Sequence, residues 1–413
     1  MRILFVTQII PYPPHGGVLQ RGYNLLRELG AEHDVQLLAF HHPDELPHGE
    51  PLDRSRVELG RFCRDIEYFP LWVKKSALHK LVAFALGAVY PKPFSVLAQR
   101  SGALARRIEA ICRSANPPDI VHLDTIALAP YRRFCGSVPV VLGHHNIESQ
   151  LMARRAPHEA SVAARKYVEA QTRRLVAYER EHAGEFRMNI TVSDADSAML
   201  RSICPAAATA AIPNGVDTNY FAPRAGEETP AVIYTGGMNM FANRDAVEWF
   251  LEAIWPRIRA RIPDARFFAV GTRPSQKVLD AARANIGVEA PGFVDDVRPW
   301  VARAAVYVVP LRVGGGTRLK MVDAMAQGKA IVATPVGAEG IDGRDGEEFV
   351  LAAEPEAFAD KVVALLGDVT ERQRLGRAAR LRAENKYAWP ILGRELASIY
   401  SRVVGEPRIV DKR

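Results

Sequence analysis

Short runs of consecutive apolar residues alternate with helical patterns along most of the chain. Strands that are apolar along their whole length are buried on both faces, as in parallel sheets that helices cover on either side. The pattern therefore predicts the α/β class. The predicted strands are residues 3–7, 34–40, 119–124, 138–143, 188–193, 231–236, 265–271, 305–310 and 329–334.

One segment interrupts this alternation. Residues 212–230, IPNGVDTNYFAPRAGEETP, are rich in Pro, Gly, Asn and Asp, which predicts an interdomain linker. A chain of 413 residues also exceeds one ordinary core. We therefore predict two Rossmann-like, doubly wound domains facing a cleft, residues 1–212 and 213–387, with a C-terminal helix, 388–404, packing back on the first. Ligands of such sheets bind outside the carboxyl ends of the strands.

The net charge and the number of cysteines indicate which kind of partner and which cellular compartment to expect. The net charge of +7 favours an anionic partner, whether phosphate, anionic lipid or nucleic acid. The four cysteines, at 63, 112, 135 and 204, form no C-x-x-C pair and no zinc-like cluster, which is typical of a reduced, cytoplasmic protein. The N-terminus lacks a basic region and a cleavage site and is expected to be a strand. The longest other apolar run, residues 81–90, is shorter than the roughly 20 residues of a bilayer span, so no transmembrane helix is expected.

A glycine-rich turn, VGGGTRLK, follows the strand at 305–310 and leads into a helical pattern. Glycines such as Gly315 and Gly316 let backbone N–H groups approach an anion closely. Thr317 is expected to cap the helix or to face the ligand. The helix start, Arg318 and Lys320 add positive charge, so the turn predicts a diphosphate site.

An acidic residue, Asp323, follows Arg318 at a distance of roughly 7.5 Å along a helix. This is about the offset between the diphosphate and the ribose of a nucleotide, and a carboxylate there accepts hydrogen bonds from both ribose hydroxyls. The alternative interpretation is a glycine loop followed by a solvated helix start.

Several motifs together resemble glycosyltransferase family 4, whose members have the two-domain GT-B fold. The segment KMVDAMAQGKAIVATPVGAEGI, residues 320–341, is similar to the family signature, with Asp323 at a glutamate position and Gly337 and Glu339 closing it. PPHGGVLQRGYNL resembles the first phosphate-facing loop, IPNGVDTNYF the linker and GFVDDVRPWVARAAVYVVPL the base-binding region. The bacterial exopolysaccharide and capsule branch, in which G-G-G-T-R-L-K and H-N-x-E recur, is the most similar.

The resemblance implies further contacts with a sugar-nucleotide donor. They fall on the glycines of two loops and on residues around the base, namely Gly16, Gly17, Gly236, Gly237, Phe293, Val294 and Leu311.

The chain departs from the family pattern at two places. The family's usual pair of glutamates falls on Gly315 and Asp323, so the first acid is missing. The usual arginine and lysine after the first strand of the second domain fall on Gly237 and Asn243. We infer that Arg318 and Lys320 neutralise the diphosphate instead, and the missing acid leaves the donor sugar open.

Two histidines follow the predicted strand at 138–143, in GHHNIES. The H-N-x-E match implies that His145 lies beside the donor sugar and the reacting centre, with His144 as the alternative and with Asn146 and Glu148 as contacts to sugar or acceptor. An isolated histidine is more often structural, but two at a sheet edge favour a functional role.

An acidic D-x-D motif, Asp194–Asp196, follows Ser193. It is interpreted as a helix start, with Ser193 as the cap, because acids in a first turn are ordinary helix chemistry. No metal site is predicted, since Arg318, Lys320 and a helix dipole suffice for a leaving diphosphate.

Residues 71–114 carry eight Lys or Arg and one acid, Glu109, interleaved with Trp72, Phe84, Tyr90 and Phe94. This predicts a face that contacts an anionic membrane or a lipid acceptor. The alternative is a helical pair with a solvated basic side. No nucleic-acid-binding module is recognisable, so nucleic acid is not an expected partner.

The resemblance implies a retaining, metal-independent glycosyltransferase that moves a sugar from a UDP- or GDP-sugar to a polyprenyl-linked or glycan acceptor. No cofactor besides this donor is expected. The expected location is the cytoplasm, at the inner face of the plasma membrane. The alternatives are a nucleotide-sugar epimerase or hydrolase with the same fold, and a catalytically silent subunit that binds a sugar nucleotide.

Overall fold

The computed structural model describes residues 1–14, 16–74, 79, 82, 86–87, 90–159, 161–224, 228–284, 286–313 and 319–405. These residues form two compact units. The first unit comprises Met1–Asn214 and the chain from Leu392 onward, and the second comprises Gly215–Ile391. The boundary at Asn214 lies inside the predicted linker, whose last residues, Thr229 and Pro230, begin a strand.

The first unit contains a seven-stranded parallel sheet in the order β3-β2-β1-β4-β5-β6-β7. Its strands are β1 (Arg2–Thr7), β2 (Asp34–His41), β3 (Asp65–Pro70), β4 (Ile120–Leu123), β5 (Val140–Gly143), β6 (Met188–Thr191) and β7 (Thr209–Ala211). Its α-helices are α1 (Gly17–Gly30), α2 (Glu50–Leu59), α4 (Phe94–Ala98), α5 (Gly102–Cys112), α6 (Glu148–Arg155), α7 (Val162–His182) and α8 (Asp194–Ile203). Helical 3₁₀ turns are η1 (Trp72–Lys74), η2 (Ile126–Phe134), η3 (Ala156–His158) and η4 (Ala183–Glu185).

The second unit contains a six-stranded parallel sheet in the order β10-β9-β8-β11-β12-β13. Its strands are β8 (Thr229–Thr235), β9 (Arg266–Val270), β10 (Val288–Gly292), β11 (Ala304–Val309), β12 (Ala330–Ala333) and β13 (Val350–Leu351). Its helices are α9 (Phe241–Trp249), α10 (Trp255–Arg261), α11 (Gln276–Arg283), α12 (Arg298–Arg303), α13 (Leu319–Ala326), α14 (Pro355–Gly367) and α15 (Val369–Arg382), with π-helical turns η5 (Phe250–Ile254) and η6 (Ala383–Tyr387). The last helix, α16 (Trp389–Gly405), belongs to the first unit from Leu392 onward.

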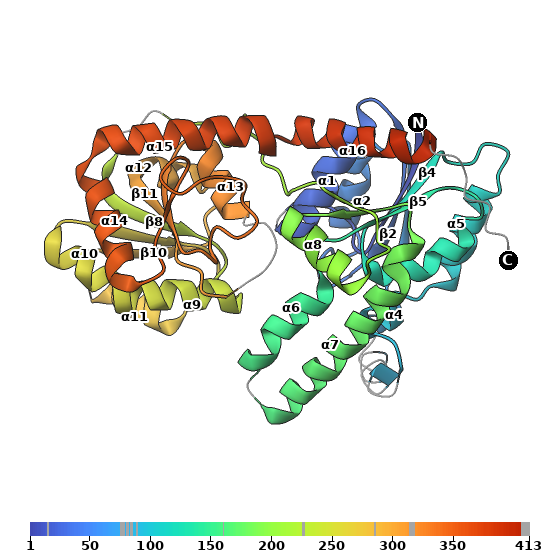
Figure 1. The fold of residues 1–413 in the computed structure, drawn as a ribbon, viewed down its shortest axis with the longest axis horizontal. Coiled ribbons are helices and arrows are strands. Elements are labelled where there is room, and N and C mark those ends of the chain that lie inside the picture. The colour runs from blue at the N-terminus through green and yellow to red at the C-terminus, as the bar shows by residue number, and fades with distance from the viewer. Residues whose placement is uncertain are drawn as a thin grey trace. The chain divides into compact units, whose positions relative to one another are not determined.

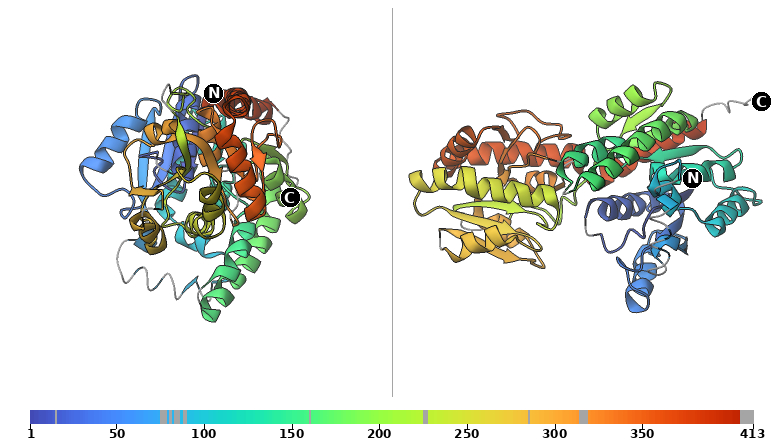
Figure 2. Two further views of the ribbon diagram at one scale, coloured as in Figure 1. Left: turned by 90° about the vertical axis from the view of Figure 1, so that its left-hand side faces the viewer. Right: turned by 90° about the horizontal axis from the view of Figure 1, so that it is seen from below.

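Helices lie on both faces of each sheet, as Figure 1 and the turned views in Figure 2 show. Every predicted strand is present. Strands covered on both faces need continuous apolar runs, and such runs can be recognised in the sequence. The predicted two-sheet, doubly wound architecture is therefore confirmed. Sequence reasoning missed β3, β7, β10 and β13.

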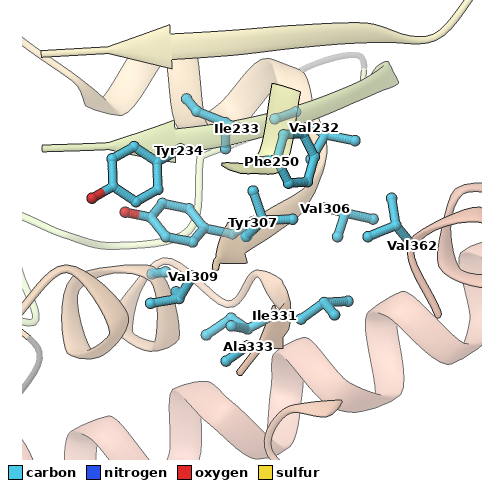
Figure 3. Packing of buried hydrophobic residues seen from close by; sticks show 14 of the residues in the cluster. Val232, Ile233, Tyr234, Phe250, Val306, Tyr307, Val309, Ile331, Ala333 and Val362 are labelled. Carbon is cyan, nitrogen blue, oxygen red and sulfur yellow. The ribbon is translucent and has the colours of Figure 1, made fainter. Parts of the chain in front are cut away.

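The core of the second unit is built on β8, β11 and β12, with helical residues such as Phe250 and Val362 packed against it. Figure 3 shows the rings of Tyr234 and Tyr307 beside each other, with both hydroxyls pointing away from Val306 and Val362. The two tyrosines are fully buried. Their hydroxyls give one end of an apolar core a polar lining.

Each sheet reverses its winding direction once. The reversal lies between β1 and β4 in the first unit and between β8 and β11 in the second. Crevices that bind ligands in open α/β sheets form at the carboxyl ends of such strands. A functional site is therefore expected at two edges. One follows Thr7 and Leu123 in the first unit, and the other follows Thr235 and Val309 in the second.

Among the residues that the structure describes, no helix is both long enough and apolar enough to cross a bilayer.

Candidate functional site

The reversal edge of the second unit is lined by glycine backbone. The glycines lie at three strand ends: Gly236 follows β8, Gly271 follows β9 and Gly292 is the last residue of β10. Backbone hydrogen bonds of 2.9 Å join Gly236 N to Val270 O and Gly271 N to Gly292 O. Gly236 has φ 151° and Gly271 has φ 156°. A side chain at Gly271 would collide with the Gly236 carbonyl. Glycine is therefore required for the strand ends to lie this close.

The ammonium group of Lys320, on α13, lies over this glycine surface. Its Nζ donates to Tyr234 Oη at 2.5 Å and to Asn243 Oδ1 at 2.6 Å. Asn243 Nδ2 donates to the Gly237 carbonyl at 2.8 Å, which orients the amide so that Oδ1 accepts from the lysine. A Cβ atom at Gly236 would lie 2.7 Å from Nζ. The structure thus brings the predicted residues Gly236, Gly237 and Lys320 together and adds Tyr234 and Asn243.

Asp323 lies on α13 three residues beyond Lys320. Its Oδ1 atom is enclosed and has no hydrogen-bond partner among the described residues. Burial raises the pKa of Asp323 to about 7. Its charge also contributes, after burial, to the raised pKa of Tyr307, whose hydroxyl bonds Thr235 Oγ1. The carboxylate therefore lies near the reversal edge with one oxygen that has no hydrogen-bond partner in the described part of the chain.

The remaining residues predicted for this edge differ in exposure. Phe293 follows Gly292 and is 70% exposed, so its ring is available to a ligand. Val294 packs partly against the core, and Leu311 is buried in it. The predicted residues Gly315, Gly316, Thr317 and Arg318 lie outside the described residues.

At the reversal edge of the first unit, Asp124 follows β4 and the two histidines follow β5. Backbone bonds fix both loops, from Asp124 N to Val6 O at 3.0 Å and from His144 N to Ile190 O at 2.8 Å. His145 Nε2 lies 3.0 Å from Asp124 Oδ2. Sequence reasoning missed Asp124, whose only signal is an acid at the end of an apolar strand.

The neighbouring His144 is turned into the protein. Its Nε2 lies 3.0 Å from Asn189 Oδ1. Asn189 uses Nδ2 to donate to the carbonyls of Ala183 and Ala208, so Oδ1 accepts and His144 donates. Burial lowers the pKa of His144 to about 4, and its enclosed Nδ1 has no hydrogen-bond partner among the residues that the structure describes. A neutral, enclosed ring of this kind indicates a structural role.

The other predicted residues of this loop surround the start of α6. Asn146 and Glu148 are half-buried, and burial raises the pKa of Glu148, opposed by the charge of His145. Ser149 N donates to Glu179 Oε1 at 3.1 Å, which ties α6 to α7. Burial raises the pKa of Glu179 to about 7. Figure 1 shows α6 and α7 as a paired helical hairpin.

Gly16 and Gly17 form the start of α1. Gly16 has φ 93°, a conformation that favours glycine, and accepts a backbone bond from Gln20 N at 2.9 Å. A Cβ atom at Gly16 would meet nothing within 4 Å. The space above this turn is open.

The D-x-D motif starts a helix, as predicted. Ser193 Oγ accepts from Asp196 N at 3.0 Å and donates to Asp196 Oδ2 at 2.5 Å. Within the described ranges, no three His, Cys, Asp or Glu side chains are grouped so that they could hold a metal ion.

Replacing Asp323 by Asn is expected to stabilise the protein at pH 8 and to leave its stability at about pH 4 unchanged. The native carboxyl has a pKa of about 7 against an ordinary 3.8. Between these values the native state binds more protons than the unfolded chain, so native stability falls as pH rises. The variant removes a penalty of about 1–3 kcal/mol. Denaturant unfolding at both pH values measures it, with Asp295→Asn, on an exposed side chain of the same unit, as the control. An equal change at both pH values would contradict the assignment.

Both halves of the chain match known protein families. Residues 15–220 match the family described as "Glycosyltransferase Family 4", and residues 229–368 match "Glycosyl transferases group 1". A phosphatidyl-myo-inositol mannosyltransferase of Mycobacterium tuberculosis is 30% identical over 211 residues, which are 47% of this chain and 54% of that protein. A GDP-mannose-dependent alpha-(1-6)-phosphatidylinositol monomannoside mannosyltransferase of Mycolicibacterium smegmatis is 25% identical over 327 residues, 68% of this chain and 84% of that protein. The chain spans about half the length of the first of these relatives.

Solved structures have the same fold. Sucrose-phosphate synthase of Thermosynechococcus elongatus superposes with a TM-score of 0.70 at 17% identity, covering 98% of this chain and 99% of that one. HepE of Anabaena, in complex with UDP and glucose, superposes with a TM-score of 0.66 at 15% identity, covering 97% and 100%. With both halves matched and the two-sheet GT-B fold observed, the chain belongs to glycosyltransferase family 4.

Proposed function

We propose that this glycosyltransferase moves a sugar, with retention of anomeric configuration, from a nucleoside-diphosphate sugar to a lipid-linked or glycan acceptor. The observation that carries the proposal is the presence on α13 of an ammonium group held in place, Lys320, and of a carboxylate, Asp323, whose enclosed Oδ1 atom has no hydrogen-bond partner among the described residues. One similar protein is GDP-mannose-dependent and another is seen with UDP and glucose. We therefore expect a UDP- or GDP-sugar as the donor.

The two α13 side chains match the two polar parts of a nucleotide. Asp323 would accept hydrogen bonds from the ribose hydroxyls, which supply the donors that its Oδ1 lacks. Lys320, together with Arg318, would bind the diphosphate over the glycine backbone of Gly236. The exposed ring of Phe293 would contact the base.

The chemistry is cleavage of the bond between the anomeric carbon and the diphosphate oxygen. Negative charge grows on the leaving diphosphate, and the Lys320 ammonium stabilises it more in the transition state than in the ground state. An acceptor hydroxyl then attacks the oxocarbenium-like carbon on the face that the diphosphate left, and the hydroxyl proton passes to the departing diphosphate oxygen. His145 of the first unit is proposed to bind a reacting hydroxyl, and His144 only to support the loop.

A lipid-linked acceptor is supported by the relatives, whose names specify phosphatidylinositol compounds. The basic segment 71–114 is the candidate membrane contact, although parts of it are engaged in the fold. Trp72 Nε1 donates to the Leu97 carbonyl at 3.0 Å, and Lys74 pairs with Asp44 at 2.6 Å. Lys75, Lys80 and Phe84 lie outside the described residues.

Release of nucleoside diphosphate tests the proposal as a whole. UDP-glucose and GDP-mannose are each incubated with the protein, with and without bacterial membrane lipid extract. Acceptor-dependent release and a product that keeps the donor's anomeric configuration are expected. Release that is independent of any extract would indicate a hydrolase, and inversion at the anomeric carbon would contradict the retaining mechanism.

Lys320→Ala is expected to weaken binding of UDP or GDP far more than binding of uridine or guanosine. A hydrogen bond to a charged group contributes about 1.5–3 kcal/mol, or roughly tenfold to a hundredfold in affinity. Calorimetry with each pair of ligands measures the difference, and Lys277→Ala, at an exposed site of the same unit, is the control. Equal losses for nucleotide and nucleoside would refute the diphosphate role.

Adding Asn243→Lys to the Lys320→Ala variant is expected to recover part of the lost diphosphate affinity. Asn243 Oδ1 lies 2.6 Å from Lys320 Nζ, so a lysine at 243 returns an ammonium group to the same place. The recovery is measured with UDP and GDP by the same calorimetry. No recovery in a variant that still binds nucleosides would show that position 243 does not reach the phosphates.

Activity is expected to persist in EDTA, because lysine, arginine and a helix start neutralise the leaving group. The assay follows nucleoside diphosphate release before and after chelation. Complete loss that manganese or magnesium restores would assign a metal to the enzyme and reopen the role of Asp194 and Asp196.

The protein is expected to co-sediment with anionic but not with neutral liposomes. Each basic residue near an anionic surface contributes about 1 kcal/mol, and salt screens the attraction over roughly 10 Å at 0.1 M. Replacing Lys74, Lys75 and Lys80 by Glu should abolish binding. The matched charge reversal of exposed residues in the second unit, Arg257, Lys277 and Arg283, should not. Equal recovery with both liposome types would contradict the membrane contact and support the alternative, a helical pair with a solvated basic side.

A further inference from the structure

A close approach of two strand ends brings Asp124 and His145 together. β4 and β5 are paired in parallel, with Leu123 opposite Leu142. A Cβ atom at Gly143 would lie 2.8 Å from His122 Nε2 and 3.2 Å from the Asp124 Cα. Glycine at this position therefore lets the end of β5 pass directly beside Asp124, and His145, two residues on, reaches the carboxylate.

The hydrogen bond between them assigns the tautomer of His145. An ionised carboxylate only accepts, so the Nε2 atom at 3.0 Å from Asp124 Oδ2 carries the proton. In the neutral ring Nδ1 then has a lone pair. Within the described ranges Nδ1 of His145 has no hydrogen-bond partner. Unlike Nδ1 of His144, this atom is not enclosed by the protein.

The other groups around Asp124 leave its carboxylate to His145. Arg21, a buried residue of α1, donates to Pro213 O at 3.0 Å and to Asn214 Oδ1 at 3.2 Å, so it acts on Asp124 through space. Burial lowers the pKa of Arg21 only to about 10, so the group remains a cation.

His122 is engaged on its other side. Its Nδ1 lies 2.6 Å from the Tyr400 hydroxyl of α16, and its Nε2 is 3.9 Å from Asp124 Oδ1, beyond hydrogen-bonding distance. Burial lowers the pKa of His122 to about 3, so the ring is neutral. Among the described residues, His145 is thus the hydrogen-bond partner of the Asp124 carboxylate, and Arg21 is a nearby buried cation.

We propose that Asp124 is a positioning residue for His145, holding the ring so that Nδ1 accepts a hydrogen bond from a sugar or acceptor hydroxyl. The part of this inference that concerns the hydroxyl rests on the proposed function. The pairing of Asp124 with His145 is independent of that function. The arrangement resembles the general use of a carboxylate to fix the tautomer of a functional imidazole.

Nitrogen NMR of the ligand-free protein tests the pairing without any activity. With histidine labelled on the ring and His145→Gln to assign its signals, the wild type at about pH 9 is expected to show His145 protonated on Nε2. Asp124→Asn should shift the ring toward the Nδ1-protonated form, because an amide N–H then faces Nε2. The control Asp34→Asn, on an exposed carboxylate that pairs with Arg64, should change nothing. A wild-type ring protonated on Nδ1 would overturn the proposal.

Kinetics test whether the pairing serves the reaction. Asp124→Asn is expected to lower kcat by roughly 10²–10⁴-fold, while affinity for UDP or GDP stays within twofold of wild type. The double variant Asp124→Asn/His145→Ala should be no slower than His145→Ala alone, since a positioning residue has nothing left to position. Fully multiplicative losses would reject positioning, and an unchanged unfolding midpoint would exclude a folding defect as the cause.

Three further outcomes identify the source of the hydroxyl and distinguish the pairing from the proposed function. If the hydroxyl belongs to the donor, Asp124→Asn slows nucleoside diphosphate release even without lipid extract. If it belongs to the acceptor, only the extract-dependent release falls. If His145→Ala keeps full activity while the tautomer shift is observed, the role of His145 in the proposed function is wrong but the pairing remains.

Discussion

Parallel pairing of strands that are buried on both faces is the constraint on which the rest of the structure depends. Such sheets have no solvated face, so their polar and charged side chains are confined to the strand ends and to the loops that follow. Because all strands of a sheet point the same way, these ends meet along one edge. The reversals between β1 and β4 and between β8 and β11 open that edge at one place in each unit. Lys320, Asp323, Asp124 and His145 all lie at or beside those places.

The strands that could be predicted are the ones that this constraint makes apolar. β11 is buried at every position, and its sequence AAVYVV needs no tertiary information to be recognised. The missed strands lack that signature. β3 is an edge strand with exposed ends, β7 and β13 are very short, and β10, VEAPG, contains proline and glycine. At a sheet edge, hydrogen bonding to one neighbour is enough to form a strand. Such a segment becomes a strand through its backbone pairing and not through its side-chain composition.

The candidate site could be proposed from the sequence where its residues are close together along the chain. The spacing of the glycine turn, Lys320 and Asp323 on one helix start was enough to select them. The partners of Lys320 were not predictable in this way, since Asn243 and Tyr234 are 77 and 86 residues away. From the sequence, Asn243 marks only a missing family lysine, whereas in the structure its amide oxygen binds the Lys320 ammonium. Asp124 and His145 are likewise 21 residues apart, and only the pairing of β4 with β5 unites them.

The carboxylates of Asp124 and Asp323 differ in the hydrogen-bond partners that the fold gives them. Asp124 lies beside a buried cation, Arg21, and its Oδ2 atom accepts a hydrogen bond from His145, so this oxygen has a partner without a ligand. Asp323 has an enclosed oxygen with no partner in the described part of the chain, and burial raises its pKa. A buried polar group left unpaired costs stability, and such a cost persists where function requires it. The carboxylate that already binds a side chain, Asp124, therefore suits a role in holding that side chain, and the one with an enclosed unpartnered oxygen, Asp323, suits a role in binding hydroxyl groups that arrive with the substrate.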